Sequence, residues 1–432
     1  MPTLSKRFAE ICESPTMALN STLARLKREG KDVVALGAGE PDFDTPAHIK
    51  AAAVAAIEAG FTKYTPAEGA MELREAVCRW MAEELKVQYK PRQVIITCGA
   101  KHAVYQGVLA VCDPGDEVIL PTPYWVSYPE MIKLAGAKMV TVNPQPDQEL
   151  KITAEQLAAA ITPRTRLLIL NSPSNPSGAV YSRSELDQLV KVIHRAGIYV
   201  LSDEIYDKIV FDDAEFVSLA AYPEIRDQLL LVNGVSKSFA MTGWRIGWIV
   251  GPEKVADAIK SYMSHSTSNP TSISQKAALQ ALNGDKAFIA EMHQAFSERR
   301  DYVQKRLTAI PGVRCFSPQG AFYAFPDISF CFGKQYKGQQ GGFDKGTADA
   351  RYRDQIEEPS EKNQSHETGN DAVNEFKINP VFVRRNDMTK AERPVRAGKA
   401  GVFGANIRAE HHRDQGQNPQ DVTEANEAKP FL

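Results

Sequence analysis

A lysine at position 237 is the residue whose surroundings best suit covalent chemistry. Lys237 lies in the segment GVSKSFAMTGWRIG (residues 234–247), directly after an apolar run that predicts a β-strand. Ser236 precedes it, and Arg245 follows eight residues later. An isolated loop lysine is usually a solvated surface charge. An amine that can form a Schiff base, next to an arginine and a hydroxyl that can hold a dianionic phosphate, instead suits pyridoxal phosphate.

A carboxylate ends the predicted strand IYVLSD (residues 198–203). Asp203 would lie at the carboxyl end of that strand, where open α/β sheets bind ligands. A carboxylate beside a pyridine nitrogen favours the protonated ring, which is the better electron sink. The alternative is that Asp203 caps a helix in the segment that follows.

The turn formed by Gly99, Ala100 and Lys101 follows another predicted strand and opens a predicted helix. Backbone amides and the helix dipole at such an end suit a phosphate. A glycine turn alone is weak evidence for a phosphate site. We expect the Lys101 side chain to lie at the surface, so that only its backbone amide would contact the phosphate.

The elements that must position these residues alternate from about residue 47 to residue 250. Alternating helices and apolar strands predict an α/β fold with a mainly parallel sheet flanked by helices. The predicted helices span residues 47–60, 70–85, 100–112, 124–136 and 182–197, and the predicted strands span 94–99, 117–121, 137–142, 166–171, 198–203 and 229–234. A long helix near 285–309 and a strand pair within 313–329 then indicate a second, smaller α+β domain.

Composition narrows the possible classes of protein. The 432 residues exceed what one core supports, so we expect two domains. A hydrophobic fraction of 43% and a net charge of −2 indicate a globular chain with no role in binding nucleic acid or membrane. The start has no apolar run of signal-peptide length, which favours a cytoplasmic location. Six scattered cysteines without C-x-x-C pairing favour reduced thiols, and no metal site is expected.

The lysine segment resembles that of class I aminotransferases, within the fold type I pyridoxal-phosphate enzymes. Further stretches match this family in the same order, over about residues 1–329: LGAGEPDFDTP with KYTPAEGAMELREA, TCGAKHAVY, PTPYWVSYPEM, and NSPSNPSGAVY with SDEIYDKI. The resemblance implies a seven-stranded sheet in a large domain (47–295), a small domain starting at 296–330, and an N-terminal segment (1–46) packing with the small domain. It also implies a homodimer with shared active sites.

The resemblance also implies a role for each matching residue. Lys237 would hold the cofactor and move protons, Asp203 would meet the pyridine nitrogen, Asn175 and Tyr206 would bond the phenolic oxygen, and Trp125 would stack on the ring. Gly99, Ala100, Lys101, Ser236 and Arg245 would hold the phosphate, together with Tyr64 from the neighbouring subunit. Gly39, Trp125 and Asn175 would border the substrate. Taken alone, Asn175 reads as a turn residue, Trp125 as core and Tyr64 as a buried strand end.

The chain departs from the family after about residue 330. No leucine occurs from position 331 to position 430, and polar residues are abundant. Arg408, in AGVFGANIRAE, is the nearest match to the arginine that forks onto the substrate α-carboxylate, and a solvated arginine is the alternative. Divergence, an insertion or a frameshift would each explain the change. We expect residues 331–432 to be an atypical polar region that is poorly ordered.

The activity implied is ping-pong transfer of an amino group from an L-amino acid to a 2-oxo acid. The overall agreement is most similar to bacterial aspartate aminotransferases, so aspartate and 2-oxoglutarate are the expected pair, with prephenate, aromatic or alanine specificity left open. A C–S lyase, an aminocyclopropane-carboxylate synthase or a catalytically impaired cofactor-binding protein would share the same cofactor residues. A dinucleotide-binding protein is disfavoured, because no G-x-G-x-x-G follows the first strand.

Overall fold

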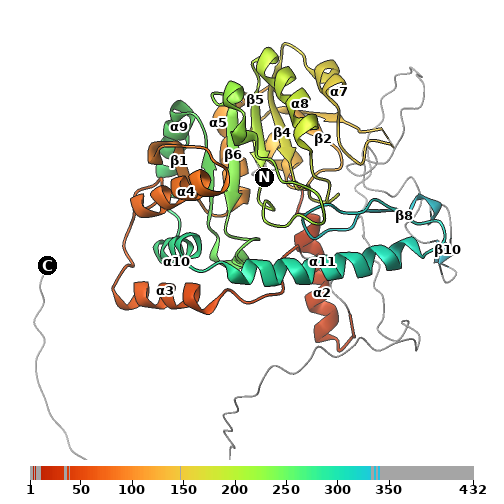
Figure 1. Ribbon diagram of the computed structural model, residues 1–432, viewed down its shortest axis with the longest axis horizontal. Helices are drawn as coiled ribbons and strands as arrows, with labels where there is room; N and C mark the ends of the chain where they lie inside the picture. The colour runs from red at the N-terminus through yellow and green to blue at the C-terminus, as the bar shows by residue number, and fades with distance from the viewer. Residues whose placement is uncertain are drawn as a thin grey trace, which may run out of the picture. The chain divides into compact units, whose positions relative to one another are not determined.

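The apolar runs of the sequence form a central sheet of seven strands (Figure 1). The computed structural model describes residues 11–33, 37, 39–145 and 147–331, together with positions 3, 5, 335, 336, 339 and 340. The strands of the sheet are β1 (Val94–Thr97), β2 (Glu117–Pro121), β3 (Lys138–Val142), β4 (Thr165–Asn171), β5 (Tyr199–Asp203), β6 (Leu229–Gly234) and β7 (Gly247–Val250). Their order is β1-β7-β6-β5-β4-β2-β3, and β7 alone runs antiparallel to its neighbours within this sheet. The mainly parallel seven-stranded fold is therefore confirmed.

Helices connect these strands. In chain order they are α2 (Pro15–Arg28), α3 (Ala47–Glu58), α4 (Met71–Glu84), α5 (Ala100–Val111), α6 (Tyr128–Leu134), α7 (Ala154–Ala160), α8 (Arg183–Ala196), α9 (Glu253–Ser264), α10 (Ser272–Asn283) and α11 (Ala287–Thr308). Short 3₁₀ turns occur at Pro91–Gln93, Leu219–Ala221, Pro223–Ile225, Thr242–Trp244 and Ser329–Cys331. α8 shows why the boundaries fall where they do: the Ser182 hydroxyl accepts from the Glu185 amide at its start, and Gly197 takes a left-handed conformation at its end.

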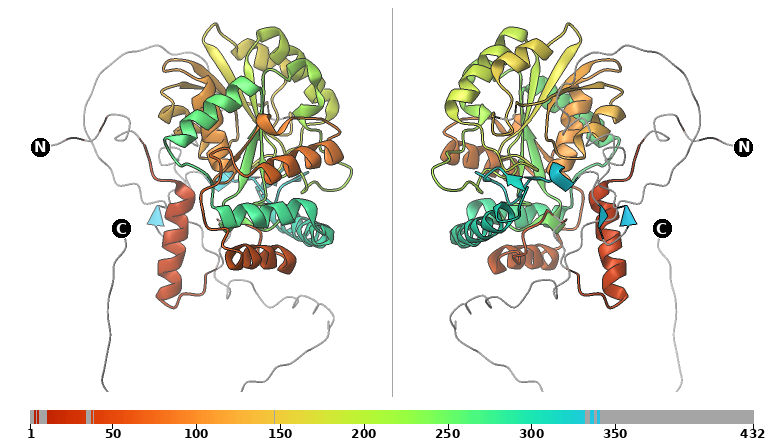
Figure 2. Two further views of the ribbon diagram at one scale, coloured as in Figure 1. Left: turned by 90° about the vertical axis from the view of Figure 1, so that its left-hand side faces the viewer. Right: turned by 90° about the vertical axis from the view of Figure 1, so that its right-hand side faces the viewer.

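Helices cover both faces of the sheet (Figure 1 and Figure 2). On one face, Leu168 and Leu231 belong to a buried cluster that includes residues of α4, α8 and α10. On the other face, Ile169 and Leu230 belong to a cluster with residues of α5, α6 and α9. Because neither face meets water, the strands read as continuous apolar runs and not as alternating patterns.

The sheet topology gathers the strand ends that matter for chemistry. The carboxyl ends of β4, β5 and β6 lie at one edge, because these strands pair in parallel. Gly247, the first residue of β7, pairs with Thr97 on one side and with Gly234 on the other. The end of β1, the start of β7 and the end of β6 therefore lie side by side.

Two predicted elements differ in the structure. The helix expected over 124–136 begins only at Tyr128, with Pro129 in its first turn, and residues 126–127 before it form a turn. Proline is accepted at the start of a helix because it lacks an N–H and has a fixed φ angle. Apolar runs do not predict β7, because its four residues GWIV follow a loop and include a glycine.

The chain beyond the sheet returns toward it. After α11, β8 (Arg314–Cys315) pairs antiparallel with β9 (Pro326–Asp327), as the expected strand pair. Between them, Gly320 forms a β-bridge with Val210, and its amide donates to the Gly178 carbonyl. Residues 318–323 thus lie against loops that follow the central strands. The division into domains at 46, 295 and 330 stays a prediction.

Past Cys331, the two short strands β10 (Gln335–Tyr336) and β11 (Gln339–Gln340) pair with each other. Residues 341–432, with Arg408 and most of the region predicted to be poorly ordered, lie outside the described residues. No helix in the described part of the chain is long and apolar enough to cross a bilayer.

Candidate active site

Lys237 lies in the loop between β6 and β7, and its amine points toward several of the predicted residues. Nζ donates to the Gly39 carbonyl and lies 5.8 Å from the centre of the Tyr206 ring and 5.6 Å from that of Phe322. Burial disfavours the ammonium form and lowers the pKa of Lys237 to about 8, against the opposing attraction of Glu40. The amine therefore exchanges protons much nearer to neutral pH than an exposed lysine.

Asp203 ends β5 as a buried carboxylate. Its Oδ2 accepts from the Tyr128 hydroxyl at 2.8 Å, and its Oδ1 accepts from the Ile205 amide at 3.3 Å. Burial raises the pKa of Asp203 to about 6, although both hydrogen bonds oppose that rise. The alternative that Asp203 caps a helix is wrong, because residues 205–208 form a turn and no helix; Asp203 is an anion at neutral pH in an apolar setting.

Tyr206 follows three residues later, with its hydroxyl 2.6 Å from the hydroxyl of Tyr323. The two rings meet edge to face at 5.7 Å. Burial raises the pKa of Tyr323 to about 12, so both phenols stay protonated and one must donate to the other. Gly39 borders this pair closely, since a Cβ there would lie 2.3 Å from the Tyr323 hydroxyl oxygen.

The turn before α5 and the end of the lysine segment form a cradle at one helix N-terminus. Gly99 precedes α5 with φ of 83°, and Arg245 takes the left-handed conformation with φ of 55°, which is uncommon for a residue with a side chain. The Arg245 guanidinium donates to the carbonyls of Thr242 at 2.9 Å and Cys98 at 3.3 Å. A Cβ on Gly99 would lie 2.5 Å from an Arg245 nitrogen, so the guanidinium lies directly against the turn.

This cradle has the donor set that an organic phosphate needs. It combines the first amides of α5, the positive end of the helix dipole and an exposed guanidinium. Ser236, which is buried, lies in the same loop as Lys237. The residues present therefore fit a cofactor that carries a phosphate, an aldehyde for Lys237 and a ring nitrogen for Asp203.

Trp125 and Asn175 flank these groups. Trp125 is half-buried, stacks edge to face on Tyr128 at 5.2 Å, and has the Lys101 ammonium 5.0 Å from its ring centre. The side chain of Lys101 is exposed, as expected from the sequence. The backbone N–H of Asn175 donates to Asn171 Oδ1 at 2.7 Å. The side-chain Nδ2 of Asn171 in turn donates to the backbone carbonyl of Asp203.

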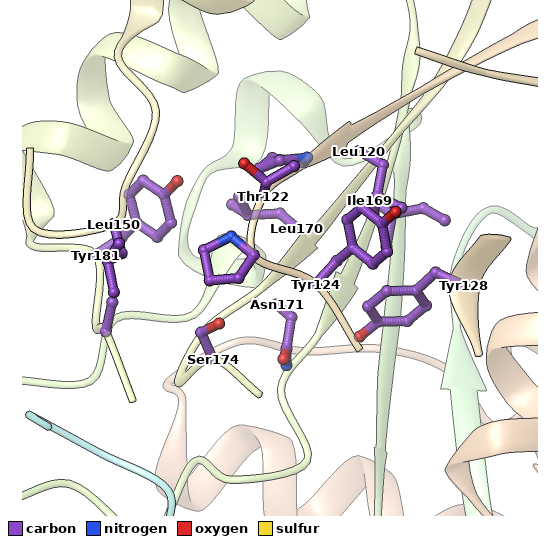
Figure 3. A pocket seen from close by; sticks show the side chains of 13 residues that line it. Leu120, Thr122, Tyr124, Tyr128, Leu150, Ile169, Leu170, Asn171, Ser174 and Tyr181 are labelled. Carbon is purple, nitrogen blue, oxygen red and sulfur yellow. The ribbon is translucent and has the colours of Figure 1, made fainter. Parts of the chain in front are cut away.

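A small cavity lies beside Asn171 and Tyr128, and Figure 3 shows the side chains that line it. Its volume of about 20 Å³ suffices for a single water molecule and for no substrate. Thr122, Tyr124, Ser174 and Tyr181 provide the other polar groups around it. This cavity therefore cannot hold a substrate.

The predicted residues fall into three groups. The first group lies around the Lys237 amine: Lys237, Gly39, Asp203 and Tyr206. The second group forms the cradle at the start of α5: Gly99, Ala100, Lys101 and Arg245. Trp125, Asn175 and Ser236 flank these two groups, and Tyr64 belongs to neither. Tyr64 is 91% exposed, so the alternative of a buried strand end is wrong. No hydrogen bond joins Tyr64 to the other named residues within the described chain. Arg408 lies outside the described residues.

Sequence reasoning missed Tyr128, Tyr323 and Phe322 as members of the site. Tyr128 stands three residues after Trp125 in PTPYWVSYPEM, and its spacing on the first turn of α6 was the available signal. Tyr323 and Phe322 stand in GAFYAFPD, which was read only as a strand. Their approach to Tyr206 depends on a contact over 117 residues that local patterns do not indicate.

Comparison with known proteins identifies the family. The family model described as aminotransferase class I and II matches residues 31–331. An aspartate/prephenate aminotransferase of Cereibacter sphaeroides is 48% identical over 340 residues, which cover 78% of this chain and 85% of that protein. An aspartate aminotransferase of Geobacillus stearothermophilus is 48% identical over 325 residues, 75% of this chain and 83% of that protein.

Solved structures agree with this. The crystal structure of the aspartate aminotransferase from Rhizobium meliloti has a TM-score of 0.74 at 43% identity, covering 77% of this chain and 84% of that one. The Thermus thermophilus aspartate aminotransferase with maleate has a TM-score of 0.74 at 42% identity, with 77% and 87% covered. With a family match over most of its length and relatives close to half identical, the chain belongs to the aminotransferases of class I and II.

Proposed function

We propose that this aminotransferase uses pyridoxal phosphate bound at Lys237 to move the amino group of aspartate to a 2-oxo acid such as 2-oxoglutarate. The observation that carries the proposal is the buried Lys237 amine, which lies beside Tyr206, close to the Asp203 carboxylate and in the same loop as Arg245. The aspartate aminotransferases of Geobacillus stearothermophilus and Rhizobium meliloti support aspartate as the donor. Prephenate is the second oxo acid to test, because the Cereibacter sphaeroides relative is named for it.

Each residue has a task that follows from its chemistry. The cofactor supplies an aldehyde that links to amines and a ring that takes up the electron pair left at the substrate Cα. Asp203, still ionised at neutral pH, would hold the proton on the ring nitrogen, and Tyr128 orients that carboxylate through its hydroxyl. Arg245 and the amides at the start of α5 hold the phosphate.

Lys237 has two tasks in turn. Its amine would hold the aldehyde of the cofactor, and when free it would take the proton from the substrate Cα. A pKa of about 8 suits this work, because the amine must be neutral to accept that proton and protonated to return it. Tyr206 and Asn175 are proposed to bond the phenolic oxygen, and Trp125 to cover the ring face.

An absorbance titration tests the cofactor and the donor together. Purified wild-type protein with pyridoxal phosphate should show a visible band that aspartate removes and 2-oxoglutarate restores, in the manner of ping-pong transfer. Pyruvate and ammonia formed without any amino acceptor would point to a lyase instead. Lys237→Ala should keep the fold and lose the covalent band. A band that persists in this variant would refute the assignment of Lys237.

We also propose a homodimer in which Tyr64 serves the site of the neighbouring subunit. The support is that Tyr64 is 91% exposed in a single chain, an unusual position for a tyrosine. Mixing Lys237→Ala with Tyr64→Ala protein tests this. Hybrid dimers then contain one intact site if Tyr64 acts across the interface, so activity returns. If Tyr64 acts within its own chain, the mixture stays as weak as Tyr64→Ala alone. The cytoplasmic location stays a prediction.

A further inference from the structure

A buried carboxylate outside the proposed site contacts the segment that carries Lys237. Asp207 is buried, and its Oδ1 accepts from the Ser238 hydroxyl at 3.3 Å. Ser238 is itself 1% exposed and directly follows Lys237. Within the described chain, Asp207 Oδ2 has no hydrogen-bond partner. The Asn233 side chain, the Ser238 hydroxyl and the Lys208 amide favour the charged carboxylate and oppose the rise in pKa that burial causes. A buried carboxylate with an oxygen left unpaired is costly, so its retention calls for a reason.

The two partners belong to the two segments that meet at the site. Asp207 lies in the turn after β5, one residue past Tyr206 and four past Asp203. That turn is closed by backbone bonds from the Asp207 amide to Glu204 and from the Ile209 amide to Tyr206. Ser238 lies in the loop after β6. No other side-chain hydrogen bond joins residues 203–209 to residues 235–240 among those that the structure describes.

Several hydrogen bonds hold the Lys237 loop. The Ala240 amide donates to the Lys237 carbonyl at 3.3 Å, the Met241 amide donates to the Ser236 carbonyl at 3.2 Å, and the Thr45 hydroxyl donates to the Ala240 carbonyl at 2.7 Å. The Asp207–Ser238 bond is the side-chain bond at the residue that directly follows Lys237. The lysine side chain has four rotatable bonds, so the placement of its Cα decides where the amine can reach.

We propose that Asp207 is a positioning residue for Lys237, acting through the hydroxyl of Ser238 to fix the amine opposite Asp203 and Tyr206. The inference rests on the proposed role of Lys237 as the cofactor lysine. Among the hydrogen bonds of the described residues, Asp207 and Ser238 make none to Gly39 or Trp125, the residues proposed to border the substrate. The link should therefore affect the covalent step and turnover and leave substrate binding unchanged.

The test compares Ser238→Ala, Asp207→Ala and the double variant. For each apo-protein, the rate of covalent capture of pyridoxal phosphate is followed by the visible band, and the attachment at Lys237 is verified by borohydride reduction and peptide mass. We expect each single variant to capture the cofactor about tenfold more slowly, and kcat to fall about tenfold with KM within about twofold. The double variant should be no slower than either single one, because both remove one link.

Two further variants make the result specific. Asp207→Asn keeps an acceptor oxygen for Ser238 and should recover to within about threefold of wild type. Tyr222→Phe removes a partly buried hydroxyl bond to the Asp187 carboxylate, 2.8 Å long and unconnected to the Lys237 loop, and should leave capture unchanged. The proposal is overturned if Ser238→Ala behaves like Tyr222→Phe, or if the two single effects multiply in the double variant. Failure of the wild type to capture the cofactor at Lys237 would overturn the proposed function as well.

Discussion

Gly247 is the position where adding a single methyl group tests the phosphate cradle most directly. It begins β7 and lies against the start of α5, and a Cβ built on it would lie 2.4 Å from the Ala100 nitrogen and 2.6 Å from the Gly99 carbonyl carbon. Both neighbours are backbone atoms, so neither can rotate away. Gly247→Ala must therefore push α5 away from β7 at the amides proposed to hold the phosphate.

The size of the effect follows from these distances. Ordinary contacts of a Cβ begin near 3.4 Å, so the two elements must separate by about 1 Å. Overpacking of this kind costs about 1–3 kcal/mol of folding free energy. Displacing an amide by about 1 Å also breaks a hydrogen bond to the phosphate, worth about 1.5–3 kcal/mol for a charged partner, which corresponds to at least about a tenfold rise in the cofactor Kd.

Gly243→Ala is the matched control in the same segment, because no atom lies within 4 Å of its added Cβ and its φ angle is not positive. Thermal unfolding of the apo-proteins and fluorescence titration with pyridoxal phosphate measure the two effects. Gly247→Ala should lower Tm by several degrees and weaken cofactor binding, while Gly243→Ala should match wild type. Equal Tm and Kd values for the two variants would refute the close contact between β7 and α5.

Three further predictions concern buried groups. Tyr128→Phe removes the 2.8 Å bond that lowers the pKa of Asp203, so the pKa of that carboxyl should rise and the acidic limb of the kcat–pH profile should move up. Tyr181→Phe, which loses a hydroxyl bond to the Ile152 amide, should leave the limb in place. Burial raises the pKa of Glu204 from 4.5 to about 8, so the folded state binds more protons than the unfolded chain in that interval and stability should fall as pH rises from about 5 to 8. Glu204→Gln should flatten this decline in urea unfolding, and an unchanged slope would contradict a protonated Glu204. Lys237→Ala should lower the single-turnover rate of transamination by at least about 10⁴-fold, since no other group in the loop can replace the amine.

The sequence predicted the sheet and the strand-end residues well, because both rest on local patterns. Long apolar runs gave six of the strands, and Asp203 and Lys237 could be placed at strand ends without knowing the strand order. β7 escaped because a four-residue strand with a glycine carries little periodicity. The start of α6 was placed four residues early, because Trp125 suits a helix by type while the chain turns there.

Contacts between distant segments could not be predicted in this way. Gly39 contacts Lys237 although the two residues are 198 positions apart in the sequence, and Tyr323 contacts Tyr206 across a separation of 117 positions. The first contact is set by how the segment before α3 reaches the loop between β6 and β7, and the second by how the chain returns to the sheet after α11. No local pattern encodes either path. The Asp207–Ser238 bond is similar, since each residue alone reads as an ordinary polar residue of a turn.

The place of β1 in the sheet has a consequence for how the protein matures. β1 pairs only with β7, which lies about 150 residues further along the chain. The strand that leads into the turn at Gly99 therefore has no strand partner until the chain has been made and folded past residue 250, and such long-range pairing is slow. The Ile96 amide donates to the Glu68 carbonyl, so we expect the other amides of β1 to gain protection late in pulsed hydrogen exchange, with pyridoxal phosphate captured only in that last phase. The cofactor would then bind only after the sheet has formed, and would stabilise the folded sheet without directing its assembly.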